Sequence, residues 1–207
     1  MLLEAGADKD IANIIDGFTA LMLACREGHV EIVRLLLEAG VNKDLANLDG
    51  FTALMLACRE GHFEIVRLLL EAGVNKDLAN LDGFTALMLA CREGRVEIMR
   101  LLVEAGVNKD LANLDGFTAL MIATEYDHLE VVRLLLDSGA DKDVFTQDYN
   151  ALMLAVDIDR IEVVCLLLEA GANKDVADNN GVAALMLACR EGNVEAARRC
   201  QQGLSKP

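Results

Sequence analysis

Four cysteines recur at one position of a repeated block, so they are the first candidates for chemistry. Cys25, Cys58, Cys91 and Cys189 each follow the letters LMLA and precede Arg-Glu-Gly. A disulfide needs Cα atoms within about 7 Å, and zinc needs sulfur ligands at about 2.3 Å. Helices stacked side by side lie roughly 8–10 Å apart, which keeps such thiols separate. We interpret the four as small buried residues and predict neither a metal nor a cofactor.

The remaining reactive side chains do not form a catalytic pattern. Cys165 is expected at the surface, where the acids Glu162 and Glu169 disfavour its thiolate. His29 and His62 are one repeat apart and are not expected to converge on one substrate. The sequence contains no Gly-x-Ser-x-Gly, His-Glu-x-x-His, Walker-type glycine loop or Cys-x-x-Cys pair. We therefore expect no enzymatic activity.

The cysteines lie inside a block that repeats every 33 residues. A fixed period of this size is the signature of a repeat architecture. The first two copies differ only at Val30 against Phe63. The letters DGFTALMLACREG occupy residues 16–28, 49–61 and 82–94.

Each block predicts a tight turn followed by a short helix. Asp49-Gly50 is a strong turn signal, because glycine readily adopts positive φ. Thr52 can cap a helix over 53–59, and Gly61 supplies a left-handed stop.

A second helix is predicted from about residue 62 to 72. Glu64, Arg67 and Glu71 form a narrow charged face, and the remaining surface is mostly apolar. A helix this short is marginal alone, and so wide an apolar face must contact several neighbours. Stacking of successive blocks meets that requirement.

The block DGFTALMLACREGHFEIVRLLLEAGVNKDLANL resembles the ankyrin repeat, a turn plus two antiparallel helices. The resemblance implies an all-α ankyrin-repeat solenoid of stacked helix-turn-helix units with short β-hairpin fingers. It covers residues 1–207 as a single array. The array is divided into a partial repeat (1–16), full repeats (17–49, 50–82, 83–115, 116–148, 149–180) and a C-terminal capping repeat (181–207).

One departure from the family pattern is systematic. The family's Thr-Pro-Leu-His appears here as Thr52-Ala53-Leu54-Met55 and its equivalents. Alanine and methionine are good helix formers, so the helix is expected to survive. We expect core packing from the methionines at this position, which are Met22, Met55, Met88, Met121, Met153 and Met186.

The two ends of the chain differ. Residues 1–13 match only the second half of a repeat, which predicts an open apolar edge and a start that is cut short. Near the other end, Arg199 and Gln201 replace Leu166 and Leu168 of the preceding repeat, as a polar cap requires.

By resemblance, partners contact the hairpin tips and the ends of the first helices on a concave groove. A ladder of aromatic residues would run along it, at Phe18, Phe51, Phe84, Phe117 and Tyr149. The ladder either contacts the partner or packs on neighbouring turns and stiffens the stack. The other contact residues implied are Leu48, Arg59, Glu60, Leu81, Arg92, Glu93 and Leu114.

Selectivity is expected where the repeats differ. An acidic group beside Tyr149 is formed by Glu125, Tyr126, Asp127, Asp157 and Asp159, and it favours a basic peptide. The formal charge of −15 repels phosphate backbones and anionic lipid, so neither nucleic acid nor a membrane surface is expected as a partner.

These observations favour a non-catalytic protein-protein interaction module, or scaffold, that is monomeric. The start of the chain resembles no signal peptide, and the expected location is the cytoplasm, with the nucleus as an alternative. Two other functions stay open: a targeting segment of a larger enzyme or channel, and a passive structural spacer.

The fourth and fifth repeats are predicted to open first. Asp127 and Asp159 replace the glycine that ends the first helix, and one turn residue is deleted near 145–150. Stability in a repeat protein follows approximately nearest-neighbour terms, so damage stays local. Amide hydrogen exchange should therefore be fastest in these two repeats, and uniform protection along the chain would contradict the prediction.

Overall fold

The computed structural model describes residues 8–146 and 149–202, and the chain divides into two compact units. The first unit is residues 1–108 and the second is residues 109–207. The described residues of the first unit form α1 (Ala20–Glu27), α2 (Val30–Glu38), α3 (Ala53–Glu60), α4 (Phe63–Glu71), α5 (Ala86–Arg92) and α6 (Val96–Glu104). Those of the second form α7 (Ala119–Glu125), α8 (Leu129–Asp137), α9 (Ala151–Asp157), α10 (Ile161–Glu169), α11 (Ala184–Arg190) and α12 (Val194–Gln202).

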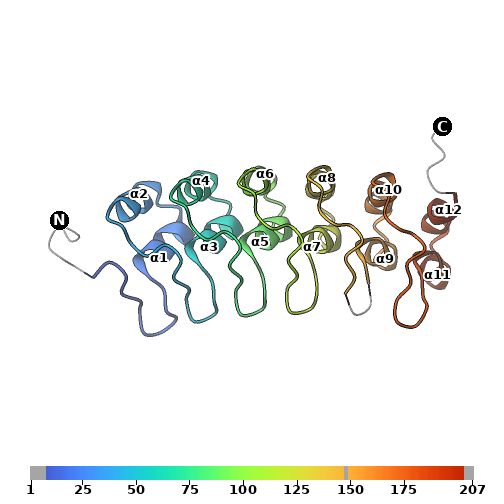
Figure 1. Cartoon of the computed structure of the whole chain (residues 1–207), viewed down its shortest axis with the longest axis horizontal. Helices are drawn as coiled ribbons and strands as arrows, with labels where there is room; N and C mark the ends of the chain where they lie inside the picture. The colour runs from blue at the N-terminus through green and yellow to red at the C-terminus, as the bar shows by residue number, and fades with distance from the viewer. Residues whose placement is uncertain (1–7, 147–148, 203–207) are drawn as a thin grey trace. The chain divides into compact units, whose positions relative to one another are not determined.

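Each unit is an all-α repeat solenoid of helix pairs, which confirms the predicted fold class. In the first unit, α1, α3 and α5 form one layer and α2, α4 and α6 form the other (Figure 1). In the second unit, α7, α9 and α11 pack side by side, as do α8, α10 and α12. A single array over residues 1–207 and its repeat boundaries stay predictions from the sequence.

In the first unit, the first helix of each repeat begins at a threonine cap and ends at or just before a glycine of positive φ, as the sequence predicts. In α3, the Thr52 hydroxyl oxygen accepts a hydrogen bond from the Met55 backbone N–H. Gly61 ends the helix at φ 91°. In the second unit, Asp127 and Asp159 adopt the left-handed region expected of them, at φ 60° and 58°.

The core lies between the two helix layers and between successive repeats. Leu54, Met55, Ile65 and Leu69 are almost completely buried in the second helix pair. The methionine prediction is confirmed for the five earlier copies but is wrong for Met186, which is 58% exposed. The last repeat therefore keeps an apolar face in contact with solvent.

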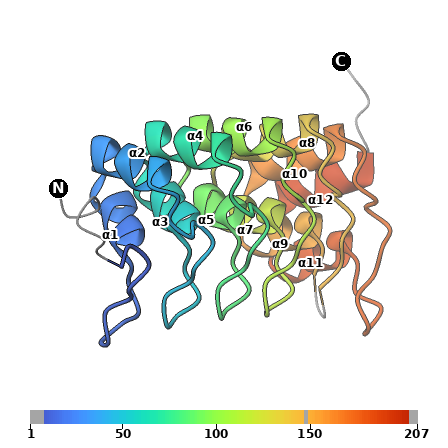
Figure 2. The ribbon, with the colours of Figure 1, turned by 60° about the vertical axis from the view of Figure 1, so that its left-hand side comes forward.

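Fingers extend from the first-helix layer of each unit (Figure 2). Isolated antiparallel bridges, such as Ala46 to Thr52, close them. Inside the finger, the buried Asn47 side-chain oxygen accepts hydrogen bonds from the backbone N–H groups of Asp49 and Phe51, at 3.1 and 2.7 Å. An asparagine at this place can satisfy the turn's own N–H groups, so no water is needed.

Backbone hydrogen bonds connect neighbouring fingers in the first unit. The Leu81 N–H donates to the Asp49 carbonyl oxygen at 3.1 Å. Where the second helix leads into the next finger, the Asn75 N–H donates to the Asp44 carboxylate at 2.8 Å. Each repeat thus fixes the turn of the next through polar as well as apolar contacts.

Replacing Gly50 should destabilise the protein more than replacing Gly73. Both have positive φ, so alanine costs roughly 1–2 kcal/mol at either position. A Cβ on Gly50 would also lie 2.7 Å from the Leu81 backbone nitrogen, whereas one on Gly73 meets nothing within 4 Å. Urea unfolding should give a larger loss of unfolding free energy for Gly50→Ala, and equal losses would contradict the close finger packing.

Candidate protein-binding surface

In the first unit, an aromatic ring, an arginine and a glutamate recur together at the end of each first helix. The Arg59 guanidinium lies 5.1 Å from the centre of the Phe51 ring, and its Nε donates to Glu60 at 2.9 Å. We call this set the Phe–Arg–Glu triad. The same contacts occur in the triads Phe18, Arg26, Glu27 and Phe84, Arg92, Glu93.

The triads place the aromatic ladder partly inside the protein. Phe18 is buried, while Phe51 and Phe84 are half-buried beneath their arginines. The cation–π contact therefore covers one face of each ring, and the groups presented outward are guanidinium and carboxylate. Ring contact with a partner stays a prediction.

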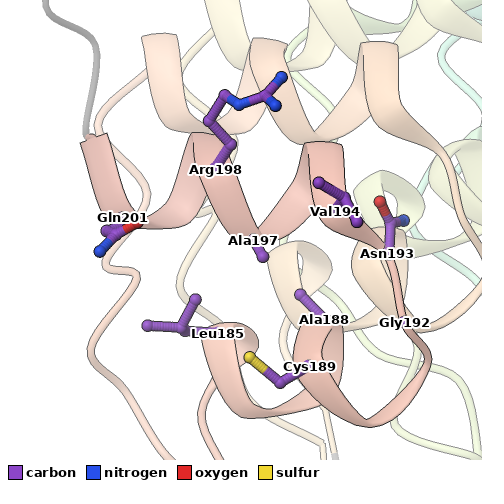
Figure 3. A pocket seen from close by; sticks show the side chains of 9 residues that line it. All are labelled: Leu185, Ala188, Cys189, Gly192, Asn193, Val194, Ala197, Arg198 and Gln201. Atoms are coloured by element: carbon purple, nitrogen blue, oxygen red, sulfur yellow. The ribbon is translucent and has the colours of Figure 1, made fainter.

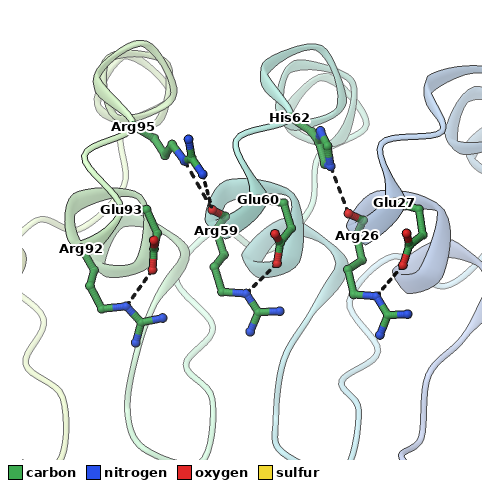
Figure 4. Close-up of polar contacts among 8 residues, drawn as sticks. All are labelled: Arg26, Glu27, Arg59, Glu60, His62, Arg92, Glu93 and Arg95. Atoms are coloured by element: carbon green, nitrogen blue, oxygen red, sulfur yellow. Dashed lines mark hydrogen bonds and ion pairs between the residues drawn. The ribbon is translucent and has the colours of Figure 1, made fainter.

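The second helix of the following repeat closes the helix end that carries each arginine. His62 Nε2 donates to the Arg26 carbonyl oxygen at 3.0 Å, and Arg95 donates to the Arg59 carbonyl oxygen at 3.4 Å (Figure 4). The last carbonyl groups of a helix have no partner within it, and they favour donors and positive charge. His62 thus acts as an inter-repeat cap.

The fingertips of the first unit carry one exposed aliphatic and one exposed acidic side chain each. Leu48 and Leu81 are about two-thirds exposed, at 65% and 68%. Asp49 and Asp82 follow them directly and are also exposed. Among the described residues, neither carboxylate forms an ion pair. In the second unit, Leu114 is exposed on its own finger.

The triad is not repeated at the equivalent positions of the second unit. Glu125 takes the place of the arginine, and Phe117 is half-buried. The Tyr126 ring, which is 49% exposed, stacks on His128 with ring centroids 6.5 Å apart. This helix end therefore presents a carboxylate and a phenol in place of a cation.

The predicted acidic group has partners in the repeat that follows it. Asp127 forms an ion pair with Arg160 at 3.6 Å, and Asp157 forms one with Arg190 at 3.0 Å. The Asp159 carboxylate accepts a hydrogen bond from the Asn193 side chain at 2.6 Å. Sequence reasoning missed these partners, although each lies about one period downstream.

Arg190 also affects the pKa of the Tyr149 phenol. Burial raises the pKa of the Tyr149 phenol, and the nearby Asp157 carboxylate raises it further, while Arg190 opposes the rise. The phenol consequently stays neutral at physiological pH. Tyr149, Asp157 and Arg190 form one polar cluster instead of an open acidic patch.

The cysteine ladder is buried except at its last member. Burial raises the pKa of Cys25 to about 12, and it raises the pKa of Cys58 and Cys91 too. The expectation of burial is wrong for Cys189, which is exposed because no repeat covers it among the described residues. Over residues 8–146 and 149–202, no three His, Cys, Asp or Glu side chains come together as a metal site.

Cys165 is half-buried on α10. Burial raises its pKa, and the neighbouring acids, Glu169 among them, contribute to the rise against the opposing Arg199. Burial and the neighbouring acids both favour the protonated thiol, and the expected surface position is only partly realised.

Comparison with known proteins identifies the repeats. A family model described as ankyrin repeats (3 copies) matches residues 1–80, 72–146 and 144–199. The search of curated proteins gives no match to the chain. Within residues 8–146 and 149–202, no helix has both the length and the apolarity to cross a bilayer.

Coupling between Arg59 and Phe51 should be measurable in a double-mutant cycle. Arg59→Ala and Phe51→Leu each remove the contact, and the interaction energy should be about 0.5–1 kcal/mol by urea unfolding. Arg67 lies on α4 and pairs with Glu64, so the cycle of Arg67→Ala with Phe51→Leu serves as control and should give no coupling. Equal values in the two cycles would argue against a specific ring contact.

Proposed function

The chain belongs to the ankyrin-repeat family, and from that premise we propose that it is a scaffold module that binds a partner protein through its fingertips and first-helix ends. Ankyrin repeats are generally protein-protein interaction modules and are typically non-catalytic. What this chain adds is a particular surface, built from the exposed fingertip residues and the triads of the first unit.

The observation that carries the proposal is the exposed leucine on each finger. Leu48 and Leu81 have no role in the core, because most of each side chain contacts solvent. Isolated exposed leucines are ordinary, but these two stand at the same place on adjacent fingers connected by the Leu81 N–H to Asp49 hydrogen bond. A row of aliphatic anchors on a rigid support is suited to protein binding.

Charge indicates the chemistry of the partner. Asp49 and Asp82 stand beside the two leucines, and the whole chain carries a formal charge of −15. We therefore propose a partner segment with aliphatic and basic side chains. In the second unit, Arg160 and Arg190 already neutralise Asp127 and Asp157, so Glu125 is the more available acid there.

Rigidity supports the same function. The Asn47 and Thr52 side chains satisfy backbone N–H groups within the finger and the first helix, and His62 satisfies a carbonyl oxygen of the preceding repeat. A partner would thus meet a surface whose conformational entropy is already lost in folding. Preorganisation of this kind lowers the cost of binding.

Affinity capture from native cell extract tests the proposal. The chain with Leu48→Glu and Leu81→Glu should lose its partner by at least about tenfold, since burying a charge opposes binding. The control is Phe63→Glu on α4, an exposed apolar residue that belongs to the second-helix layer and should keep the partner.

Two results would count against the proposal. Capture that is unchanged by the fingertip variants would favour the passive spacer, whose interactions need no dedicated surface. Loss of the partner in the Phe63→Glu control, with the fingertip variants unaffected, would place the binding surface on the second helices.

A further inference from the structure

One finger of the second unit exchanges the two polar residues of its turn. The fingers closed by the bridges at Ala46, Ala79 and Ala112 carry the letters NLDG at their tips. The finger over residues 177–183 carries DNNG instead. The carboxylate and the carboxamide have thus changed places, and Asn180-Gly181 is the only Asn-Gly pair in the sequence.

Asp178 takes over the part that Asn47 plays in a regular finger. Its Oδ1 accepts hydrogen bonds from the backbone N–H groups of Asn180 and Val182, at 2.8 and 2.7 Å. The hydrogen bond from Val182 is the main cause of a lowered pKa of the Asp178 carboxyl, which is therefore ionised at physiological pH. The turn is formed without help from the Asn180 side chain.

The Asn180 side chain is exposed and weakly held. Its Nδ2 donates to Asp178 Oδ2 at 3.4 Å, which is longer than the roughly 2.7–3.2 Å of an ordinary N–H···O hydrogen bond. The Gly181 N–H donates to the Asp178 carbonyl oxygen at 3.0 Å, and an isolated bridge between Ala177 and Ala183 closes the finger. Opening of the tip therefore breaks few contacts, as is typical of the least stable parts of a fold.

We propose that Asn180 is a site of spontaneous deamidation in the folded protein. In the first step, solvent base removes the proton of the Gly181 backbone N–H, and the nitrogen lone pair attacks Cγ of Asn180. A bond forms between that nitrogen and Cγ, and the bond from Cγ to Nδ2 breaks. Nδ2 takes a proton from water and leaves as ammonia, and the product is a cyclic succinimide.

Water opens the ring in the second step. Attack of water on Cγ breaks its new bond to the Gly181 nitrogen and gives aspartate, with the original backbone restored. Attack on the backbone carbonyl carbon of Asn180 breaks the bond from that carbon to the Gly181 nitrogen and gives isoaspartate, in which the chain passes through Cγ. Over both steps water is consumed and ammonia is released, so the reaction needs no oxidant and no cofactor.

The glycine after Asn180 distinguishes this asparagine from the others. Every other asparagine precedes a residue with a side chain, which shields the attacking nitrogen and restricts the backbone. Asn179 lies in the same finger and is also exposed, but Asn180 follows it. Asn47, Asn80 and Asn113 are buried, and their side-chain oxygens accept hydrogen bonds within their turns.

Either product adds a negative charge beside an existing one. Asp178 then faces a carboxylate in place of the Nδ2 donor, and like charges this close repel each other. Isoaspartate also lengthens the backbone by one methylene group, which shifts the Val182 N–H relative to the Asp178 carboxylate. We expect the modified finger to open more readily. The reaction needs no partner protein, so its failure would leave the proposed function untouched.

Incubation of the purified chain in physiological buffer, followed by peptide mass spectrometry, tests the site. Asn180 should convert to aspartate and isoaspartate several-fold faster than Asn179, the matched control in the same finger. Asn173, which is exposed and precedes Lys174, is a second control. An isoaspartate-specific methyltransferase should label the aged wild type but not Asn180→Gln, because glutamine would have to close a larger ring.

Three results would overturn the proposal. The first is an Asn180 that stays intact, and the second is an equal rate at Asn179 and Asn180. A parallel incubation in urea provides the third, since it compares the folded protein with the unfolded chain. Conversion in urea without conversion in buffer would show that the folded finger protects the carboxamide.

Two variants test the effect of the added charge. Asn180→Asp places two carboxylates in the turn, whereas Asp178→Asn combined with Asn180→Asp reproduces the polar residues of the regular fingers. Amide hydrogen exchange over residues 177–183 should be several-fold faster in the single variant than in the wild type, and the double variant should exchange like the wild type. Equal exchange in the two variants would contradict repulsion at the fingertip.

The effect should stay within the finger. Cys200 on α12 is 3% exposed, whereas Cys189 is exposed in a groove of about 650 Å³ between α11 and α12 (Figure 3). The ratio of their alkylation rates with iodoacetamide reports opening of this helix pair, with Cys189 as the reference for the reagent. Asn180→Asp should leave the ratio unchanged, and a relative rise at Cys200 would contradict a local effect.

Discussion

Burial of each helix pair against the next repeat is the interaction on which the structure depends. The helices are only seven to nine residues long, a length at which an isolated helix is marginal in water. Leu54 is buried by the repeat that follows it and Ile65 by the repeat that precedes it, because their counterparts Leu185 in the last repeat and Ile32 in the first are exposed. Contacts between repeats thus stabilise the fold. The surface that remains free for a partner is the surface that stacking leaves exposed.

The polar groups follow from the same constraint. Short helices expose a large share of unpaired backbone groups at their ends, and stacking removes many of these from water. Thr52 satisfies an N–H group inside its own repeat, whereas His62 satisfies a carbonyl oxygen of the preceding one. Arg95 makes the equivalent contact with a different side chain, so an imidazole or a guanidinium can serve as the donor.

The sequence predicts those structural features that are determined by residues near one another along the chain. Residues close together in the sequence predict the helix cap at Thr52, the helix end at Gly61 and the left-handed conformation of Asp127. The structure confirms all three. It does not predict pairings across repeats, such as Asp157 with Arg190, because these depend on which side chains stacking brings together. Nor does it separate Met22 from Met186, whose neighbouring letters are identical and whose burial differs only through the adjacent repeat.

Because the first repeats are nearly identical, they can distinguish little between different partner sequences or binding positions. Three copies of the Phe–Arg–Glu triad present the same groups at equal intervals, so a partner shifted by one repeat would meet almost the same surface. Such a surface can contribute affinity but little discrimination. The second unit breaks this degeneracy, because Glu125 and Asp157 stand in the place of the arginine, and Tyr149 and Val182 stand in the place of the phenylalanine. Discrimination between partner sequences therefore depends on the irregular repeats rather than on the near-identical ones.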